Sequence, residues 1–415
     1  MGFPARRRFG VLAALAVALG VGAALATEAP VASADATPVN APARGQSATS
    51  AHHQAGKVRP AVGTAMAQDR TRRPSGARAP RALIQPDTTA QPGLTVTRSG
   101  QSPLLLPSGS TGAAELSGLT FAGGTTYFAV GDNGAKKIWQ LYTSLDSGTG
   151  RIRSTLVTAG INTPGLGTDS EGIAGRPGGN SVWIADEVTS SINEFSLATG
   201  LTVGSVPVPD IYRPANVQNN MGLESLTFGR DTLWTANEEA LRPDGALSTT
   251  SAGSWVRIQQ FAGPELTAGT QYAYRTDPIS RLSPFVNVER SGLVDLLALP
   301  SGDVLALERE LGGYLPHYRT RIYLLDFTGA SDVTSVSSLS DGGFTAVGKA
   351  LLWQANTGFS NFEGITLGPE LSDGSYALIL VSDNGSGALA QRQDSFSLTL
   401  RGIGDLTPTA SPIEM

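Results

Sequence analysis

The sequence predicts an all-β protein, a β-propeller built from four-stranded blades. Gly is abundant, with 50 residues in 415, and the charged fraction is a modest 16%, a composition that suits short strands joined by tight turns. One unit of two apolar strands recurs along the chain, and four of its five copies are followed by two further strand-like segments. The strands therefore group in fours, which is typical of propeller blades.

Five copies of the repeated unit can be aligned. Each begins with a small or acidic residue, continues with two apolar strands around a turn, and ends with an acidic residue. The copies are ELSGLTFAGGTTYFAVGDNG (115–134), DSEGIAGRPGGNSVWIADEV (169–188), GLESLTFGRDTLWTANEEAL (222–241), GLVDLLALPSGDVLALERE (292–310) and NFEGITLGPELSDGSYALILVSDNG (361–385). Equivalent positions, separated by 54, 53, 70 and 69 residues, hold Gly118, Gly172, Ser225, Asp295 and Gly364. Such a period indicates propeller blades or a solenoid, and four strands per unit favour the propeller.

The fifth copy supplies only three strands, GITLG, YALILVS and SFSLTLR. The strand-like segment LTVTRS at 94–99 has no place in another blade. We therefore expect it to pair beside residues 395–401 and to close the ring, because closure of this kind hides the edges of the sheet. Five blades are favoured, and six are the alternative if a 70-residue interval contains a degenerate blade.

The N-terminal segment has the pattern of a secretory signal. Residues 1–34 carry Arg6, Arg7 and Arg8, then an apolar run that is short for a membrane helix, then the small residues Ala-Ser-Ala. The three arginines also match part of a twin-arginine signal. We therefore expect a secreted or extracytoplasmic protein, exported by the Sec or the twin-arginine route, with no segment that spans a membrane.

Composition divides the rest of the chain. Residues 35–83 are rich in Ala, Pro and Arg and have almost no large apolar side chains, which predicts a disordered leader. The propeller is assigned to residues 84–405, and residues 406–415 form a short C-terminal tail. Residues 84–415 carry 19 basic and 32 acidic residues, a net charge of −13. An acidic domain lacks the basic surface that nucleic-acid binders need and suits cations instead. With no Cys, disulfides and thiolate chemistry are excluded.

Acidic residues recur at the ends of the repeated hairpins. Glu residues open three first strands, and acids close all five second strands. In an antiparallel hairpin the start of the first strand lies beside the end of the second, so these groups should gather at one mouth of the central channel. Close like charges need compensation, and a divalent cation with oxygen ligands, Ca²⁺ first, is the natural partner. The predicted metal ligands are Asp132, Glu171, Asp186, Glu224, Glu238, Glu308, Glu363 and Asp383.

Amide residues stand beside several of these acids. The neighbouring Asn133, Asn237 and Asn384 could add neutral oxygen ligands. Alternatively, acids and amides at strand ends serve turns, where they accept hydrogen bonds from local backbone.

The hairpins SEGIAGRPGGNSVWIADE, NMGLESLTFGRDTLWTANEEAL and VLALERE, with NFEGITLG and LVSDN, resemble the phytase-like family, labelled "esterase-like activity of phytase" and grouped with β-propellers. The resemblance covers roughly residues 112–402 and implies phosphoester-cleaving or esterase-like activity on a small anionic ester. The chain lacks the Arg-His-Gly-x-Arg-x-Pro motif of histidine acid phosphatases and the Asp-rich signature of calcium-dependent alkaline β-propeller phytases. A phosphoesterase of this sequence would need a metal at the acidic mouth to activate water and neutralise phosphate charge.

The predicted catalytic residues are Glu171, Glu224 and Glu363, with Arg309 and His317. Arg309 could clamp a phosphate or carboxylate with two hydrogen bonds, or else pair with an adjacent Glu. His317 is the sole His outside the leader and would have to serve any Ser-His-Asp triad. No G-x-S-x-G elbow supplies the Ser, and the alternative for His317 is packing among neighbouring Tyr residues.

The sequence therefore leaves two candidate functions. One is an exported, metal-dependent hydrolase of phosphoesters or related esters. The other is a non-catalytic secreted propeller that binds a carbohydrate, a peptide or a cell-envelope partner. Propellers host both kinds of function, so the fold does not choose between them. In either case we expect a monomer without a nucleic-acid partner.

Overall fold

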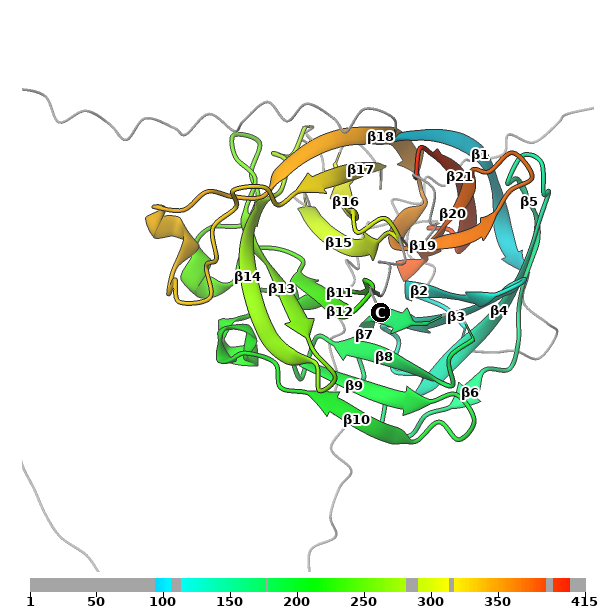
Figure 1. Ribbon diagram of the computed structural model, residues 1–415, viewed down its shortest axis with the longest axis horizontal. Coiled ribbons are helices and arrows are strands. Elements are labelled where there is room, and N and C mark those ends of the chain that lie inside the picture. The colour runs from blue at the N-terminus through cyan, green and yellow to red at the C-terminus, as the bar shows by residue number, and fades with distance from the viewer. Residues whose placement is uncertain are drawn as a thin grey trace, which may run out of the picture. The chain divides into compact units, whose positions relative to one another are not determined.

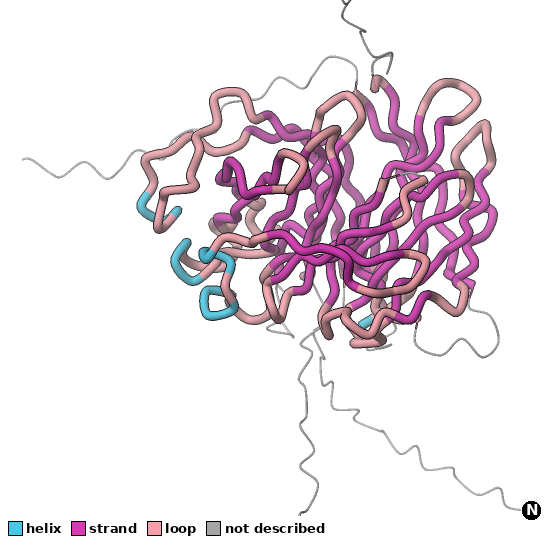
Figure 2. Tube along the Cα trace, turned by 60° about the horizontal axis from the view of Figure 1, so that its bottom comes forward, coloured by secondary structure: helices cyan, strands magenta, loops and turns pink. Residues whose placement is uncertain are grey.

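The computed structural model describes residues 94–105, 113–176, 178–280, 290–312, 317–385 and 391–403. These residues form a five-bladed β-propeller of four-stranded antiparallel blades (Figure 1). Regular structure in the described part is almost entirely strand (Figure 2), apart from four 3₁₀ turns at Asp210–Tyr212, Pro214–Asn216, Arg242–Asp244 and Leu339–Asp341. The predicted signal, leader and C-terminal tail lie outside the described residues. No helix in the described ranges has the length and apolar character needed to cross a bilayer.

The first two blades follow one another along the chain. The strands of the first blade are β2 (Leu116–Gly123), β3 (Thr126–Gly131), β4 (Lys137–Leu145) and β5 (Ile152–Val157), and the two-residue β6 (Ile161–Asn162) pairs with β4. Those of the second blade are β7 (Ser170–Gly175), β8 (Ser181–Asp186), β9 (Ser191–Ser196) and β10 (Thr202–Val206).

The remaining blades continue the same order. The third contains β11 (Leu223–Phe228), β12 (Thr232–Asn237), β13 (Trp255–Ala262) and β14 (Thr267–Arg275). The fourth contains β15 (Arg290–Ala298), β16 (Val304–Leu311), β17 (Tyr318–Asp326) and β18 (Gly348–Gly358). The fifth contains β19 (Asn361–Glu370), β20 (Tyr376–Asp383), β21 (Asp394–Arg401) and β1 (Thr95–Leu105).

The N-terminal strand supplies the fourth strand of the last blade. β1 runs antiparallel to β21, with Thr95 opposite Arg401 and Val96 opposite Leu400. At its far end β1 also pairs in parallel with β5 of the first blade, so that the first and fifth blades share one continuous sheet. That this pairing closes the ring stays a prediction.

The first strand of each blade lies innermost, and each contacts the inner strands of both neighbours. Figure 1 shows β2, β7, β11, β15 and β19 around the centre, with β5, β10, β14, β18 and β1 at the periphery. Apolar side chains fill the spaces between neighbouring blades. One such cluster joins the fourth and fifth blades through residues that include Leu305, Ile322, Leu378 and Leu398. Packing between blades fixes the inner strands and therefore the positions of residues around the channel.

Three glycines set how closely the inner strands approach. A Cβ atom on Gly172 would lie 2.6 Å from the backbone nitrogen of Leu226, and one on Gly364 would lie 2.5 Å from the carbonyl oxygen of Ser117. A Cβ on Gly118 would be closer still to the carbonyl oxygen of Glu171. No side chain fits in this space, and only Gly allows the backbones to come so near. The Gly of each repeated Glu-Gly pair is thus a requirement of packing.

Asp295 takes the equivalent place in the fourth blade. Its carboxylate accepts hydrogen bonds from the backbone nitrogens of Leu296 (2.8 Å) and Ile365 (2.8 Å) and from the backbone of Leu226. Burial raises the pKa of Asp295 well above its ordinary value, while the three backbone donors act in the opposite direction. One side chain therefore joins the third, fourth and fifth inner strands. We call this level of the channel the waist, formed by Gly118, Gly172, Ser225, Asp295 and Gly364.

Candidate functional site

A β-bulge occurs at the same place in every blade, just before the waist. The pairing of the first two strands shifts register between Leu223 and Ser225, and at the matching positions of the other four blades. The extra residues are Ser117, Glu171 with Gly172, Glu224, Val294 and Glu363. Because a bulge redirects side chains at the end of a strand, it explains how three predicted Glu residues come to face the channel.

Seven carboxylates line a cavity at this end of the channel. They are Asp132, Glu171, Glu187, Glu224, Glu238, Glu363 and Asp383, and we call them the acidic mouth. Arg290, Arg309, Asn220 and Asn361 are among the other lining residues. The cavity volume is about 40 Å³, which is room for an ion or a few water molecules.

The second strands contribute one equivalent residue each. Asp132, Glu187 and Glu238 donate backbone hydrogen bonds to the carbonyl oxygens of Glu115 (3.1 Å), Asp169 (2.9 Å) and Gly222 (2.9 Å). Arg309 and Asp383 pair in the same register with Gly292 and Asn361. This position occurs once in each of the five blades, and it therefore holds four acids and one Arg.

Two predicted metal ligands stand one residue away from this position and are not brought to the cavity. Asp186 is opposite Ser170, and Glu308 is opposite Leu293. A step of one residue along a strand moves a side chain to the other face. Of the eight predicted ligands, the other six lie in the acidic mouth.

Both of these side chains have other partners. Asp186 accepts hydrogen bonds from the backbone nitrogen (2.9 Å) and hydroxyl (2.6 Å) of Thr189, and from the nitrogen of Asp169 (3.3 Å). Glu308 accepts hydrogen bonds from the hydroxyl of Tyr274 (2.5 Å) and the Nζ of Lys349 (2.6 Å). Asp186 thus organises a turn, and Glu308 lies in a buried ion pair.

Sequence reasoning missed Glu187, which takes the place expected for Asp186. Its Oε1 accepts a hydrogen bond from the backbone nitrogen of Gly222, and the side chain lines the cavity. Aligning the ends of the second strands as AVGD, IADE, TANE, ALER and LVSD would have placed Glu187 level with Glu238 and Arg309.

The three Asn residues beside the acids also have partners outside the cavity. The Oδ1 atoms of Asn133, Asn237 and Asn384 accept hydrogen bonds from the backbone nitrogens of Ala135 (3.0 Å), Arg257 (2.9 Å) and Glu115 (2.8 Å). These three therefore serve the backbone. Among the described residues that line the cavity, the amide oxygens without a hydrogen-bond partner belong to Asn361 and Gln391, which the sequence did not single out.

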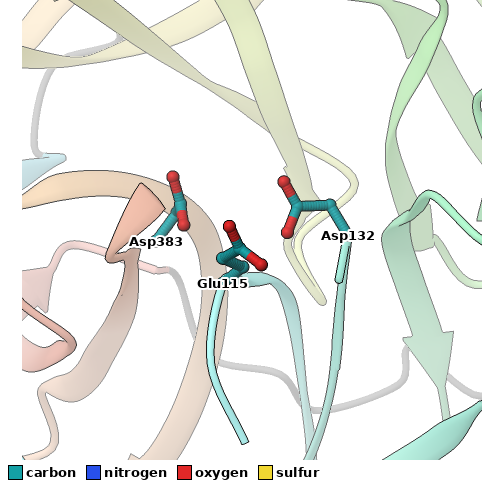
Figure 3. A group of neighbouring side chains, drawn as sticks. All are labelled: Glu115, Asp132 and Asp383. Carbon is teal, nitrogen blue, oxygen red and sulfur yellow. The ribbon is translucent and has the colours of Figure 1, made fainter. Parts of the chain in front are cut away.

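Three overlapping groups of carboxylates have ligand oxygens within 4.8 Å of one another. They are Glu115 with Asp132 and Asp383, Asp132 with Asp169 and Glu171, and Glu171 with Glu187 and Glu224. Figure 3 shows the first group, in which side chains from the first and fifth blades converge. In the third group all three residues are buried. We call Glu171, Glu187 and Glu224 the buried trio.

The Oε2 atom of Glu224 is buried and has no hydrogen-bond partner, and the residue is 7% exposed. Leaving a buried polar atom without a partner is costly. The Oδ1 atom of Asp132 is in the same situation. Carboxylate and amide oxygens are the ligands that hard cations such as Ca²⁺ prefer. The residues present therefore fit a divalent cation.

Arg309 supplies an internal positive charge to one side of the mouth. Its Nη2 donates hydrogen bonds to Glu238 (2.9 Å) and Glu363 (2.9 Å) from two other blades. Burial opposes the charge of Arg309, but these two carboxylates raise its pKa above the ordinary value. The buried trio has no such direct ion pair among the described residues.

The pKa values reflect this difference. Burial raises the pKa of all three members of the buried trio well above the ordinary value, and neighbouring carboxylates add to the effect. Burial, with help from Asp383, raises the pKa of Asp132 to about 10. For Glu363 burial raises the pKa and Arg309 lowers it, so that the result is about 7.

His317 lies just before β17 and is half-buried. It is not among the residues that line the acidic mouth. Tyr314, its expected neighbour, falls outside the described residues. His317 therefore does not share this cavity with the carboxylates.

The chain matches the family model described as "Phytase-like: Esterase-like activity of phytase" over residues 111–385. It belongs to this family. No curated protein matches the sequence. The buried carboxylates thus belong to a propeller whose family description names esterase-like activity.

Several solved structures are similar at low identity. Hydrazine synthase of Kuenenia stuttgartiensis is 11% identical, with a TM-score of 0.30 over 66% of this chain and 57% of that chain. Glutaminyl cyclase of Myxococcus xanthus is 10% identical, with a TM-score of 0.34 over 74% of this chain and 97% of that chain. Hsv2 of Kluyveromyces lactis is 7% identical, with a TM-score of 0.23 over 57% of this chain and 61% of that chain. The phytase-like propeller therefore spans little more than half of the first of these chains.

Proposed function

We propose that this phytase-like propeller is an exported, metal-dependent hydrolase of phosphoesters or related esters. A divalent cation, Ca²⁺ first, would be held by Glu171, Glu187 and Glu224. The observation that carries the proposal is the unpartnered Oε2 of Glu224, buried within a trio that lacks a direct cationic partner. The family description supports an ester as the substrate.

A cation bound there would supply positive charge that neutralises an anionic ester and acidifies a water molecule. The chain's own residues supply the rest. Arg309 lines the same mouth, and its Nε is buried without an acceptor, so it can donate to an anionic oxygen of the substrate. Arg290 also lines the cavity and adds to the attraction for an anion.

Glu363 is suited to proton transfer. Its pKa is about 7, and a group with a pKa near the working pH is the most effective general acid or base. Its carboxylate is held by Arg309 (2.9 Å), by Asn361 Nδ2 (2.8 Å) and by the hydroxyl of Ser117 (3.2 Å). These three donors would fix its direction at the cavity.

One observation favours the second candidate, a non-catalytic propeller that binds a partner. The cavity of about 40 Å³ is far smaller than the several hundred Å³ of ordinary small-molecule sites. In that case the cation would join the second and third blades as part of the fold.

Thermal unfolding with Ca²⁺ and with a chelator tests the cation site. We expect Ca²⁺ to raise the melting temperature, with a gain in stability of about 2.7 kcal/mol at a hundredfold excess over the dissociation constant. Glu224→Gln should abolish the response. Glu308→Gln is the matched control, because it changes a buried Glu that does not line the cavity, and its Ca²⁺ response should persist. A wild-type melting temperature indifferent to Ca²⁺ would overturn the cation site.

Turnover separates the two candidate functions. Chromogenic phosphate esters and carboxylate esters would be screened with and without Ca²⁺. The hydrolase predicts Ca²⁺-dependent turnover that falls in Glu224→Gln and Glu363→Gln. A Ca²⁺-dependent rise in melting temperature with no turnover of any ester would make the binding propeller the better account.

A further inference from the structure

A second and larger cavity lies at the opposite end of the same channel. Its volume is about 400 Å³, and residues from the far ends of all five inner strands line it. Most of these are apolar, among them Phe121, Ala174, Phe228, Leu299 and Leu367. We call this cavity the apolar mouth. Its size is within the range of small-molecule sites, which are mostly apolar with a few polar groups.

Three Thr hydroxyls on its wall already accept hydrogen bonds. The Oγ1 atoms of Thr120, Thr227 and Thr366 accept hydrogen bonds from backbone nitrogens of adjacent inner strands, at 3.0, 3.1 and 3.1 Å. The three hydroxyls therefore help to join the blades. The waist, with Asp295 across it, lies between this wall and the acidic mouth, so the apolar mouth is a well that opens on one side.

Two arginines stand at the rim of the well. The guanidinium of Arg176 lies 4.5 Å from the ring centroid of Phe228, and its Nη1 donates to the carbonyl oxygen of Arg230 (3.0 Å). Arg230 lines the cavity and donates from Nε to the carbonyl oxygen of Pro300 (3.1 Å). Both are exposed, and within the described ranges neither forms an ion pair with a carboxylate. The backbone thus positions two positive charges beside an apolar well.

We propose that the apolar mouth binds a small amphipathic anion, a carboxylate with a medium-length alkyl chain. The alkyl chain would lie against the apolar walls, because burial removes apolar surface from water. The carboxylate would remain at the rim, where Arg176 and Arg230 donate charge-assisted hydrogen bonds. This inference does not depend on the acidic mouth or on the proposed hydrolase.

Isothermal titration calorimetry of the full chain with decanoate tests the proposal. We expect saturable binding of one molecule. Decyltrimethylammonium, which has a similar chain and the opposite charge, should not bind. Arg230→Gln and Arg176→Gln should each weaken decanoate binding about tenfold. Arg213→Gln is the matched control, because it removes another exposed Arg, and its affinity should equal that of the wild type.

Two more variants locate the site. Ala298→Phe places a ring among the lining residues and should block decanoate, whereas Glu224→Gln changes the other mouth and should leave decanoate binding unchanged. No saturable binding by the wild type would overturn the proposal. So would equal binding of the cationic amphiphile, or wild-type affinity in both Arg176→Gln and Arg230→Gln.

Discussion

The two mouths of the channel are built on the same five inner strands and have opposite chemistry. At the acidic mouth seven carboxylates surround a cavity of about 40 Å³. At the apolar mouth, mostly aliphatic and aromatic side chains surround about 400 Å³, with arginines at the rim. Unpartnered polar atoms mark the first, whereas the Thr hydroxyls of the second are all engaged.

This difference begins at a short irregularity of the strands, the β-bulge. The bulge before each waist position brings the Glu side chains of three inner strands into the channel. Just beyond the waist Thr alternates with large apolar residues in LTF and ITL, and the next register shifts of β2 and β19 follow only after Phe121 and Leu367. The glycines and Asp295 hold the strands together between the two regions. Each mouth can therefore acquire its own chemistry without disturbing the other.

The largest expected effect comes from breaking the waist. Asp295→Ala removes the acceptor of hydrogen bonds from three inner strands and leaves buried N–H groups without partners. At 1–3 kcal/mol for each such group, we expect a loss of about 4 kcal/mol in the free energy of unfolding. Urea unfolding would measure it. Asp295→Asn keeps one acceptor oxygen and should cost less; equal stability of Asp295→Ala and the wild type would refute the role of the waist.

The acidic mouth should make stability depend on pH when divalent ions are chelated. The folded pKa of Glu363, about 7, exceeds its unfolded value near 4.5. Its contribution to stability is therefore complete below about pH 4.5 and is lost as the pH rises through about 7. The loss is about 3 kcal/mol at roughly 1.4 kcal/mol per pH unit, and the buried trio acts in the same direction.

Urea unfolding between pH 4.5 and 8 in chelator would measure this loss. Saturating Ca²⁺ should offset it, because the ion favours the ionised carboxylates. Glu363→Gln should show a shallower pH profile than the wild type. A chelated wild type whose stability does not fall over this range would contradict the predicted repulsion.

Gly172→Ala tests how tightly the inner strands are held at the waist. The added Cβ would lie 2.6 Å from the backbone nitrogen of Leu226, and overpacking of this kind costs about 2 kcal/mol. Gly269→Ala is the matched control, since its Cβ would meet nothing closer than 3.3 Å. If chemical denaturation gave the two variants the same stability, close approach of the strands would not explain the repeated glycines.

The smallest effect is expected on the wall of the apolar mouth. Thr227→Val preserves the shape of the side chain but removes the acceptor for the backbone nitrogen of Ala298 (3.1 Å). We expect a loss of about 1 kcal/mol, measured by thermal unfolding. The Ca²⁺-dependent rise in melting temperature should be the same as in the wild type. A variant that lost this rise would show that the two mouths are coupled rather than independent.

Much of the candidate site was visible in the sequence. Glu171, Glu224 and Glu363 precede equivalent waist positions in three repeats, and all three line the acidic mouth. The register of the second strands was harder to read, because Asp186 is followed directly by Glu187, and Arg309 lies between Glu308 and Glu310. Composition cannot distinguish neighbours that face opposite sides of a hairpin. Only the register of hydrogen bonds does so.

The sequence alone determined the repeat, the grouping of strands into fours and the recurrence of acids at strand ends, since all of these are periodic along the chain, and it favoured five blades over six. Tertiary structure decided which acids share a cavity. Glu238, Arg309 and Glu363 meet although 54 to 71 positions separate Arg309 from its partners, and the bulges and the waist determine that meeting. Contacts across a ring depend on how blades pack, a three-dimensional relation that no local pattern of residues records.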